Sequence, residues 1–316
     1  MPEMILPGTY IEVRAEKLIS AGPIAIGNVG IVGTARRGKL ANPDTTDPAA
    51  PDPAVYTPSN IGEARDIFGD PDSFFEPDDP DDPRKELTLV RALELAFANG
   101  AQRVYAARVA ADAADGAVYD LPPNVQLTSV APGDGYNQAQ IALLDDGGGG
   151  LDVTITLATV LESWRSVPAN AEDFVKVING EHVAYNYRAL ASTGGGSNLF
   201  VAALSGAAGD VAPTPEGSPI DTPSTEGTNG AKAGESDYAD GLAALENQLV
   251  HIVVLAGQGL DAADTLTAHV RNASTDLMKH ERIGVIGSDP SKAVDDLVAP
   301  DELTGRIVFA GPGVKV

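Results

Sequence analysis

The segment Gly33–Leu40, Gly-Thr-Ala-Arg-Arg-Gly-Lys-Leu, nearly spells a phosphate-binding loop. Such a loop needs Ser or Thr directly after its Lys, because that hydroxyl group holds the magnesium ion of a bound nucleotide. Here the position is Leu40, and Asn42-Pro43-Asp44 follows where a helix would have to begin so that its N-terminus faces the phosphates. The sequence therefore favours a basic turn at the end of a strand over a nucleotide site. Its basic side chains are candidates for ionic contacts with an acidic neighbour: Arg36, Arg37 and Lys39.

Other motifs of catalytic and metal sites fit this sequence poorly. The acidic run Asp70–Asp82 lacks the glycine that an EF-hand calcium loop needs at its sixth position, so we predict a solvated loop. The histidines never stand at i and i+4 on one helix, no G-x-S-x-G nucleophile elbow occurs, and the chain has no cysteine. We therefore predict no catalytic residue, no metal site and no cofactor. His251 and Trp164 are both predicted to be packed core residues.

The composition is that of an acidic protein with an aliphatic core. The net charge is −24, which repels nucleic-acid phosphates and argues against direct nucleic-acid binding. Hydrophobic residues make up 43% of the chain and aromatic residues only 5%, and 316 residues are enough for two domains. The longest apolar stretch is near Leu249–Ala256, far shorter than the roughly 20 residues of a membrane helix, and the N-terminus does not have the pattern of a signal peptide. We expect a soluble protein without membrane insertion.

The patterning of the chain changes along its length and predicts a discontinuous α/β fold. Strands and helices alternate in two separate stretches, which implies a mostly parallel sheet with right-handed crossovers. From the N-terminus we predict an extended arm, the first part of the α/β core, an inserted β-rich domain, a flexible low-complexity loop and the second part of the core: residues 1–22, 23–111, 112–205, 206–236 and 237–316.

Apolar runs and helical stripes give the expected elements of the α/β core. The predicted strands are 29–33, 103–109, 249–255, 282–286 and 306–310. The predicted helices are 59–68, 83–99, 290–298 and one that Asp261 caps, with Leu266, Val270, Ala273 and Leu277 on its apolar stripe. The helix 83–99 is expected to use Asp82 as its cap and to end at Gly100.

The middle of the chain reads as β structure followed by a loop. We predict strands at 127–130, 138–144 and 151–157, with a hairpin turn at Asp145–Gly150, and a helix over 171–179. Residues 206–236 are Gly, Pro, Ser, Thr and Glu with few apolar anchors, so we expect deletion of 210–234 to be tolerated.

The N-terminal arm carries a solitary strand pattern. The residues alternate in polarity and are rich in β-branched and aromatic types, but no partner hairpin stands beside them. Such a strand must pair with a distant part of the fold or with another chain. The residues of this predicted inter-subunit arm are Tyr10, Ile11, Glu12 and Val13.

Short motifs in a fixed order along residues 5–200 carry a family resemblance. They are Pro7–Glu12, Ile24–Gly38, Ser59–Gly69, Leu89–Val109, Leu127–Asn137 and Glu162–Asn179. The first resembles the Pro-Gly-x-Tyr-x-Glu start of contractile tail sheath proteins, which occur in myophages and phage-like contractile injection systems. The others resemble, in order, that family's first core strand ending in V-G-T-A-x-x-G, a helix ending in Phe-Gly, an A-x-x-x-F-x-N-G helix with its strand, and the entry and end of an inserted domain.

The resemblance implies a virion structural protein that is not an enzyme. Sheath subunits stack as rings in a helical homo-oligomer around an inner tail tube protein, between a baseplate and a tail terminator. Arms that add strands to neighbouring subunits join them, which is β-augmentation. Contraction drives the tube through a target envelope by rigid-body motion without nucleotide. The implied location is a virion tail or injection particle assembled in the host cytoplasm.

One departure from the family pattern leaves alternatives open. The family core continues past its last x-x-P-G strand, whereas this sequence ends at Ala310–Val316. A second sheath polypeptide that completes the core, a shortened paralogue and a fragment are all compatible with this ending. The alternatives to a sheath subunit are a tail cap or baseplate protein with a sheath-like fold and, less favoured because of Leu40 and Pro43, an α/β nucleotide-binding enzyme.

Overall fold

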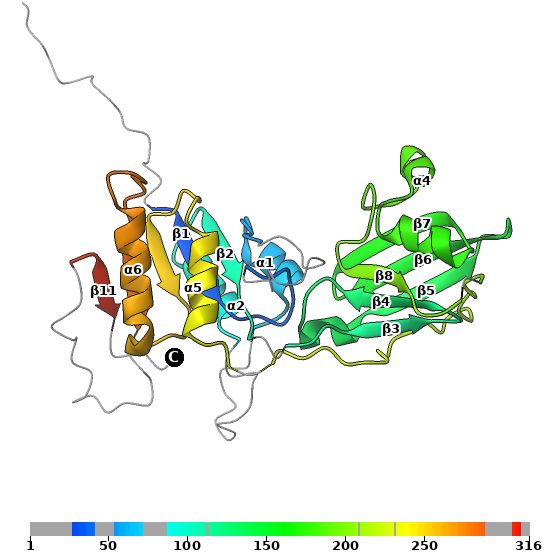
Figure 1. The fold of residues 1–316 in the computed structure, drawn as a ribbon, viewed down its shortest axis with the longest axis horizontal. Helices are drawn as coiled ribbons and strands as arrows, with labels where there is room; N and C mark the ends of the chain where they lie inside the picture. Colours follow the sequence, from blue (N-terminus) through cyan, green and yellow to red (C-terminus); the bar gives the residue numbers. More distant parts are fainter. Residues whose placement is uncertain are drawn as a thin grey trace, which may run out of the picture.

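The computed structural model describes residues 27–41, 54–71, 87–111, 114–207, 209–230, 232–287 and 305–310. The predicted arm strand Tyr10–Val13, most of the acidic run 70–82 and the predicted helix 290–298 lie outside these residues. The described chain forms two regions side by side (Figure 1). We call residues 27–111 with 232–310 the α/β region and residues 114–230 the β region.

A five-stranded parallel sheet forms the centre of the α/β region, in the order β11-β10-β9-β1-β2. Its strands are β1 Val29–Gly33, β2 Val104–Arg108, β9 Ile252–Leu255, β10 Ile283–Gly287 and β11 Ile307–Ala310. The sheet confirms the α/β class and the parallel arrangement predicted from strand and helix alternation. The central strand β1 joins the two halves of the chain, because it pairs with β2 on one side and with β9 on the other.

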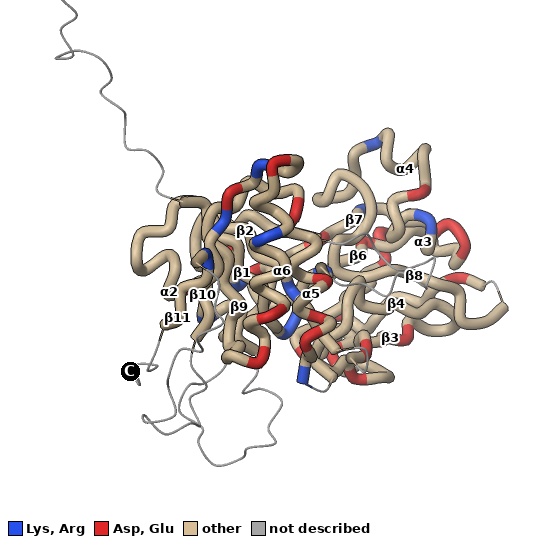
Figure 2. The backbone as a smooth tube through the Cα atoms, turned by 60° about the vertical axis from the view of Figure 1, so that its left-hand side comes forward, with Lys and Arg blue, Asp and Glu red and all other residues tan. Residues whose placement is uncertain are grey.

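Helices cover the two faces of this sheet unequally. α1 (Ile61–Phe68) and α2 (Leu89–Ala98) lie on one face over β1 and β2, and α5 (Glu235–Ala244) and α6 (Ala263–Ala273) lie on the other. Figure 2 shows α2 on one side of the strands and α5 and α6 on the opposite side. Gly241 of α5 allows its close approach to the sheet, since a Cβ there would stand 2.5 Å from a methyl carbon of Val32.

Two helices begin later than the sequence predicts. α2 begins at Leu89, whereas Leu87 and Thr88 are described and not helical, so the predicted start at Pro83 is wrong. The reason is tertiary: the Thr88 hydroxyl donates to the carbonyl oxygen of Ala256 at 2.9 Å, which anchors the chain to the end of β9 before the helix starts. The prediction that Asp261 caps the next helix is wrong: Asp261 lies inside a 3₁₀ turn, Leu260–Ala262, and α6 follows with Ala262 at its N-cap and no side-chain cap.

Two single-residue predictions in this half of the chain are also wrong. His251 is exposed just before β9, and its Nδ1 accepts the backbone N–H of Asn28 at 3.1 Å. Leu277 is 90% exposed beyond the end of α6, whereas the other three stripe residues of that helix are buried as predicted. In both cases the apolar pattern in the sequence continues beyond the residues that form the strand or helix.

The β region contains two three-stranded antiparallel sheets around one core. The first has the order β3-β4-β8 and the second β5-β6-β7. Their bounds are β3 Val118–Leu121, β4 Val125–Ser129, β5 Gln140–Asp145, β6 Gly150–Leu157, β7 Val160–Pro168 and β8 Phe200–Leu204. The 3₁₀ turn Asp134–Gln138, α3 (Ala171–Ile178) and α4 (Val183–Tyr187) complete the region.

Local signals predicted much of this region. Strands β4, β5 and β6, the turn after Asp145 and helix α3 lie where the sequence places them. Asn170 caps α3, since its side chain accepts the N–H groups of the second and third residues of the helix. Trp164 is fully buried and donates its indole N–H to Gly195, which confirms its packing role. Strands β3, β7 and β8 and helix α4 of this region, and helix α5 of the α/β region, were not predicted.

The returning segment 209–230 has no regular helix but makes more contacts than its composition suggests. Val211 is 2% exposed, and isolated bridges join Thr225 to Val118, Ile220 to Ile141 and Asp210 to Asn170. The predicted lack of apolar anchors is therefore wrong, because single apolar residues spaced along a Gly- and Pro-rich stretch form no periodic pattern. Deletion of 210–234 removes these contacts and is now expected to destabilise the β region.

Candidate assembly site

The basic turn after β1 lies at the junction between the two regions. Arg36 Nη1 pairs with Asp134 Oδ2 of the β region at 2.7 Å, and the Arg36 carbonyl accepts the N–H of Gly135 at 3.1 Å. Gly133 allows this approach because it has a φ of 140° and a Cβ there would stand 2.0 Å from the Arg36 carbonyl oxygen. The basic turn Gly33–Leu40, which resembles a phosphate loop in sequence, thus contacts the backbone of the β region.

The other two basic residues of this turn have different partners. Arg37 is 5% exposed and donates from Nη2 to the carbonyl of Arg65 at 3.0 Å, near the C-terminus of α1, where a cation is favourable. Burial lowers the pKa of Arg37, and Asp66 and Asp70 oppose this shift. The backbone N–H of Lys39 donates to the Tyr56 hydroxyl at 3.3 Å. Within the described part of the chain no carboxylate lies within salt-bridge distance of Lys39.

A fully buried arginine at the end of β2, Arg108, also stabilises the junction. Its guanidinium donates to three carbonyl oxygens, of Ala35 at 2.9 Å, Gly38 at 2.6 Å and Pro132 at 2.7 Å. Burial lowers its pKa to about 10, so the group is still a cation at neutral pH. Arg108 therefore ties the end of β2 to the turn after β1 and to the entry of the β region.

Aromatic side chains complete this junction. The hydroxyl of the buried Tyr136 accepts the N–H of Gly38 at 3.2 Å, and burial raises the pKa of Tyr136. Tyr119 donates to the Tyr136 carbonyl at 2.8 Å, and both rings make edge contacts with Phe200. A hydrogen bond from Thr159 to Asp66 adds a further contact between the regions. These contacts join the two regions through buried hydrogen bonds and aromatic packing.

The sequence analysis named Arg36 but missed Arg108 and Asp134. One signal was present: Arg108 is a single charge at the end of an otherwise apolar strand, all five residues of which are buried. Such a charge must find partners or lower its pKa. The identity of those partners was not readable, because Ala35 and Pro132 come from separate parts of the chain.

A second candidate surface is the outer edge of the parallel sheet. Within the described residues β11 pairs with β10 and has no strand on its other side. Its residues alternate between partly buried and exposed, and Val308 is 49% exposed. Unpaired backbone N–H and C=O groups at such an edge can accept a further strand.

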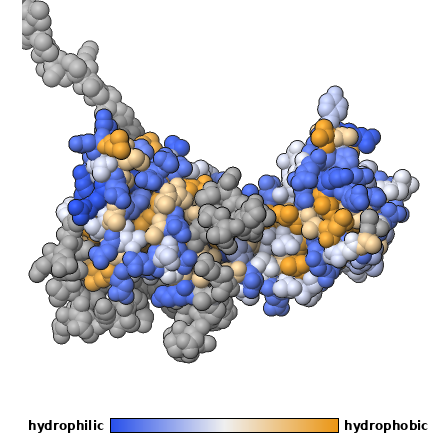
Figure 3. Space-filling view, viewed as in Figure 1, coloured by the Kyte–Doolittle hydropathy of each residue, from blue (hydrophilic) through white to orange (hydrophobic). Residues whose placement is uncertain are grey.

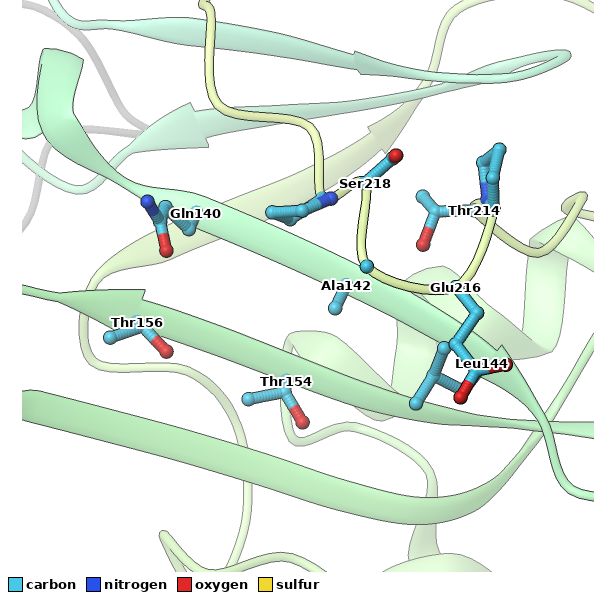
Figure 4. A pocket seen from close by; sticks show the side chains of 11 residues that line it. Gln140, Ala142, Leu144, Thr154, Thr156, Thr214, Glu216 and Ser218 are labelled. Atoms are coloured by element: carbon cyan, nitrogen blue, oxygen red, sulfur yellow. The ribbon is translucent and has the colours of Figure 1, made fainter.

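A shallow pocket of about 180 Å³ lies on the outer side of β5 and β6 (Figure 4). Gln140, Thr154 and Thr156 form its floor, and the turn 214–219 forms a wall. The Thr214 hydroxyl is engaged with the backbone of Leu143. Glu216 is the only titratable residue among the lining residues.

Three further observations on the described residues concern metal binding, membrane spans and surface hydropathy. In the described ranges no group of three or more His, Asp or Glu side chains is placed to hold a metal ion. No helix among the described residues has the length and hydropathy needed to cross a membrane. Figure 3 shows mostly hydrophilic residues on the α5–α6 side and hydrophobic residues gathered over β8, where Val201 and Leu204 are exposed.

Comparison with known proteins gives structural likeness only. No protein-family model matches the sequence, and no curated protein matches it. Among solved structures, the sheath tail protein of Listeria innocua superposes with a TM-score of 0.51 and 14% identity over 84% of this chain. The sheath tail protein of Desulfitobacterium hafniense superposes with a TM-score of 0.50 and 16% identity over 97% of this chain.

The chain has the fold of sheath tail proteins. The match extends through both regions, since most or nearly all of this chain is covered in the two superpositions. The chain spans 48% and 57% of the two sheath structures, about half of their length. The resemblance found in the sequence motifs is thus supported independently by three-dimensional likeness.

Proposed function

We propose that this chain is a structural subunit of a contractile tail sheath, which polymerises around an inner tube and contracts to drive that tube through a target envelope. The observation that carries the proposal is the sheath fold extending over 84% and 97% of the chain in the two superpositions. No catalytic role is proposed. The β region is then an inserted domain, and the segment 209–230, predicted as part of a separate loop, packs against it.

The proposed partners follow from a tail assembly. They are further copies of this chain in stacked helical rings, the inner tail tube protein, the baseplate, the tail terminator and a second sheath polypeptide that completes the core. The proposed location is a virion tail or injection particle assembled in the host cytoplasm. The β11 edge supports β-augmentation, because its outer side has no described partner strand.

The junction gives this proposal a mechanical basis. Contraction by rigid-body motion requires each subunit to transmit force without bending between its parts. Arg36, Arg108 and Tyr136 join the two regions through an ion pair and buried hydrogen bonds. We propose that the basic turn serves this internal connection and that the arm Tyr10, Ile11, Glu12 and Val13 serves the contact between subunits.

Negative-stain electron microscopy of the full chain, alone and co-expressed with the proteins encoded beside it, tests the proposed function. Striated tubes of sheath-like width are the expected result. A persistent monomer in both preparations would contradict the proposal.

The arm is tested in the same assay with two variants of one residue. Ile11→Pro removes a backbone N–H and is expected to prevent tube formation, because an added strand needs that donor. Ile11→Val keeps the donor and the β-branched side chain and is the matched control. Tubes formed equally by both variants would rule out strand addition through this arm.

A further inference from the structure

Half of one sheet face is apolar and has no covering helix among the described residues. The strand registers place six side chains on that face: Ile252, Val254, Ile283, Val285, Val308 and Ala310. The alternating residues Val253, Leu255, Ile286, Ile307 and Phe309 pack with α5 and α6 on the other face, which fixes the assignment. We call these six residues the open face. Ile283 is 41% and Val308 49% exposed.

The flank of α2 beside the open face is apolar as well. Glu94 of α2 pairs with Arg65 of α1 at 3.4 Å, so α1 lies on that flank of α2, over the β2 side of the sheet. At 3.6 residues per turn, Ala92 and Ala96 lie on the opposite flank, toward β9, and Leu95 lies between that flank and the outward surface of the helix. Leu95 is 57% exposed. Val254 of the open face packs against the same cluster as Ala92 and Ala96, so this flank borders the open face.

The handedness of the described crossovers explains why their helices leave this surface uncovered. The connection from β1 to β2 moves toward the β2 edge of the sheet and carries α1 and α2 on one face. The connection from β9 to β10 moves toward the β11 edge and carries α6 on the other face. Both are right-handed crossovers, the nearly universal hand. The described helices of the α/β region thus lie either over β1 and β2 or on the α5–α6 face, away from the open face.

We propose that the open face is the docking surface for an amphipathic helix of a second polypeptide, which lies beside α2 and extends the helical layer over β9, β10 and β11. Parallel sheets occur with both faces covered, and helices are the usual cover. The small side chains of Ala92 and Ala96 allow close approach of a neighbouring helix. Because the chain has a net charge of −24, the partner helix is expected to carry Lys or Arg beside its apolar stripe.

A second copy of this chain is a poorer occupant than a different polypeptide. The outward surfaces of the described helices carry exposed charges such as Glu94 on α2, Asp240 on α5 and Arg271 on α6. Placing such charges on an apolar sheet is unfavourable. The two sheath structures extend about as far again beyond the part that this chain matches, so the sheath fold includes further segments that can supply a helix. The inference rests on the proposed sheath function.

Site-specific photo-crosslinking in cells that assemble the whole tail tests this docking. A benzophenone amino acid replaces Val308 in the full chain, and the control places it at Leu161, which is 61% exposed on β7 of the other region. Mass spectrometry identifies the crosslinked peptide. The expected result is a crosslink from position 308, absent from position 161, to a segment of another polypeptide with apolar residues at helical spacing.

The variant Ile283→Lys with Val308→Lys supplies the second readout. Two charges on the open face are expected to weaken association with that polypeptide by at least about tenfold, whereas Leu161→Lys leaves association unchanged. Both sites are exposed, so near-ultraviolet circular dichroism is expected to show an intact fold. The docking would be overturned by crosslinks within this chain or to a second copy, or by no crosslink above the control. Normal association of the double variant would also overturn it. Wild-type tubes would still support the sheath function in those cases, whereas their absence would remove the function itself.

Discussion

The β region and the α/β region solve the burial of apolar surface differently. In the β region two antiparallel sheets enclose one core, with Trp164, Phe174 and Phe200 buried inside it. In the α/β region one sheet must be covered on both faces, and the open face lacks a described cover. Strands of antiparallel hairpins are close in sequence and bury one face against each other's side chains. A parallel sheet needs helices from its crossover connections to cover its faces. The difference is between one region that encloses its own core and one whose described residues leave part of a sheet face uncovered.

The largest expected effect is in the closed core of the β region. Trp164→Ala removes a fully buried side chain and the hydrogen bond from its indole to Gly195. We expect a loss of about 3–5 kcal/mol in the free energy of unfolding. Urea titration followed by circular dichroism measures it. A loss as small as that of an exposed substitution would contradict a self-contained core.

Acid is expected to weaken the α/β region through His269. Arg282 Nη1 lies 2.7 Å from His269 Nε2, and burial together with this cation lowers the pKa of His269 to about 4. The unfolded state, with a pKa near 6.5, binds the proton first as the pH falls. Stability is therefore lost from about pH 6.5 down to about pH 4, by at most about 3 kcal/mol.

The variant His269→Gln isolates this titration. Glutamine keeps an acceptor for Arg282 but does not titrate, so its free energy of unfolding should change less between pH 7 and pH 4 than that of the wild type. Urea midpoints across that range give the difference between the two proteins. Parallel pH profiles for wild type and variant would show that His269 is not protonated on unfolding in this window.

The junction between the regions is expected to depend on Arg108 more than on Arg36. Arg108→Met leaves three buried carbonyl oxygens without their donor but also removes a buried charge, for a net loss of about 2 kcal/mol. Arg36→Met breaks an ion pair whose side chains are 24% and 28% exposed, worth about 1 kcal/mol or less. Thermal unfolding of both variants ranks the two contacts, and equal losses would mean that burial does not govern the junction.

The smallest effect is expected on the open face. Val308→Thr changes a side chain that is 49% exposed in the isolated chain, so the free energy of unfolding should change by less than about 0.5 kcal/mol. Urea titration of the purified chain checks this. A loss of the size expected for Trp164→Ala would show that the open face is already covered within the chain, and the comparison between the two regions would fail.

The sequence alone determined features that depend on neighbouring residues. Short apolar runs between glycines gave β1, the run Asp145–Gly150 gave a hairpin turn, and the stripe Leu266, Val270 and Ala273 gave α6. Alternation of strands and helices gave the parallel class, and the ordered motifs gave the sheath resemblance. Periodicity and turn chemistry act over a few residues, so they can be read from one chain.

The tertiary structure alone decided how these pieces meet. The sheet order, the start of α2 at Leu89 and the partners of Arg108 and Arg36 join residues that lie far apart in the sequence. Weakly periodic strands such as β3 and β8 form because they pair with β4, and the anchors of 209–230 form because a core is already there. Each of these contacts depends on the positions of several distant segments at once, and local patterns do not encode that information.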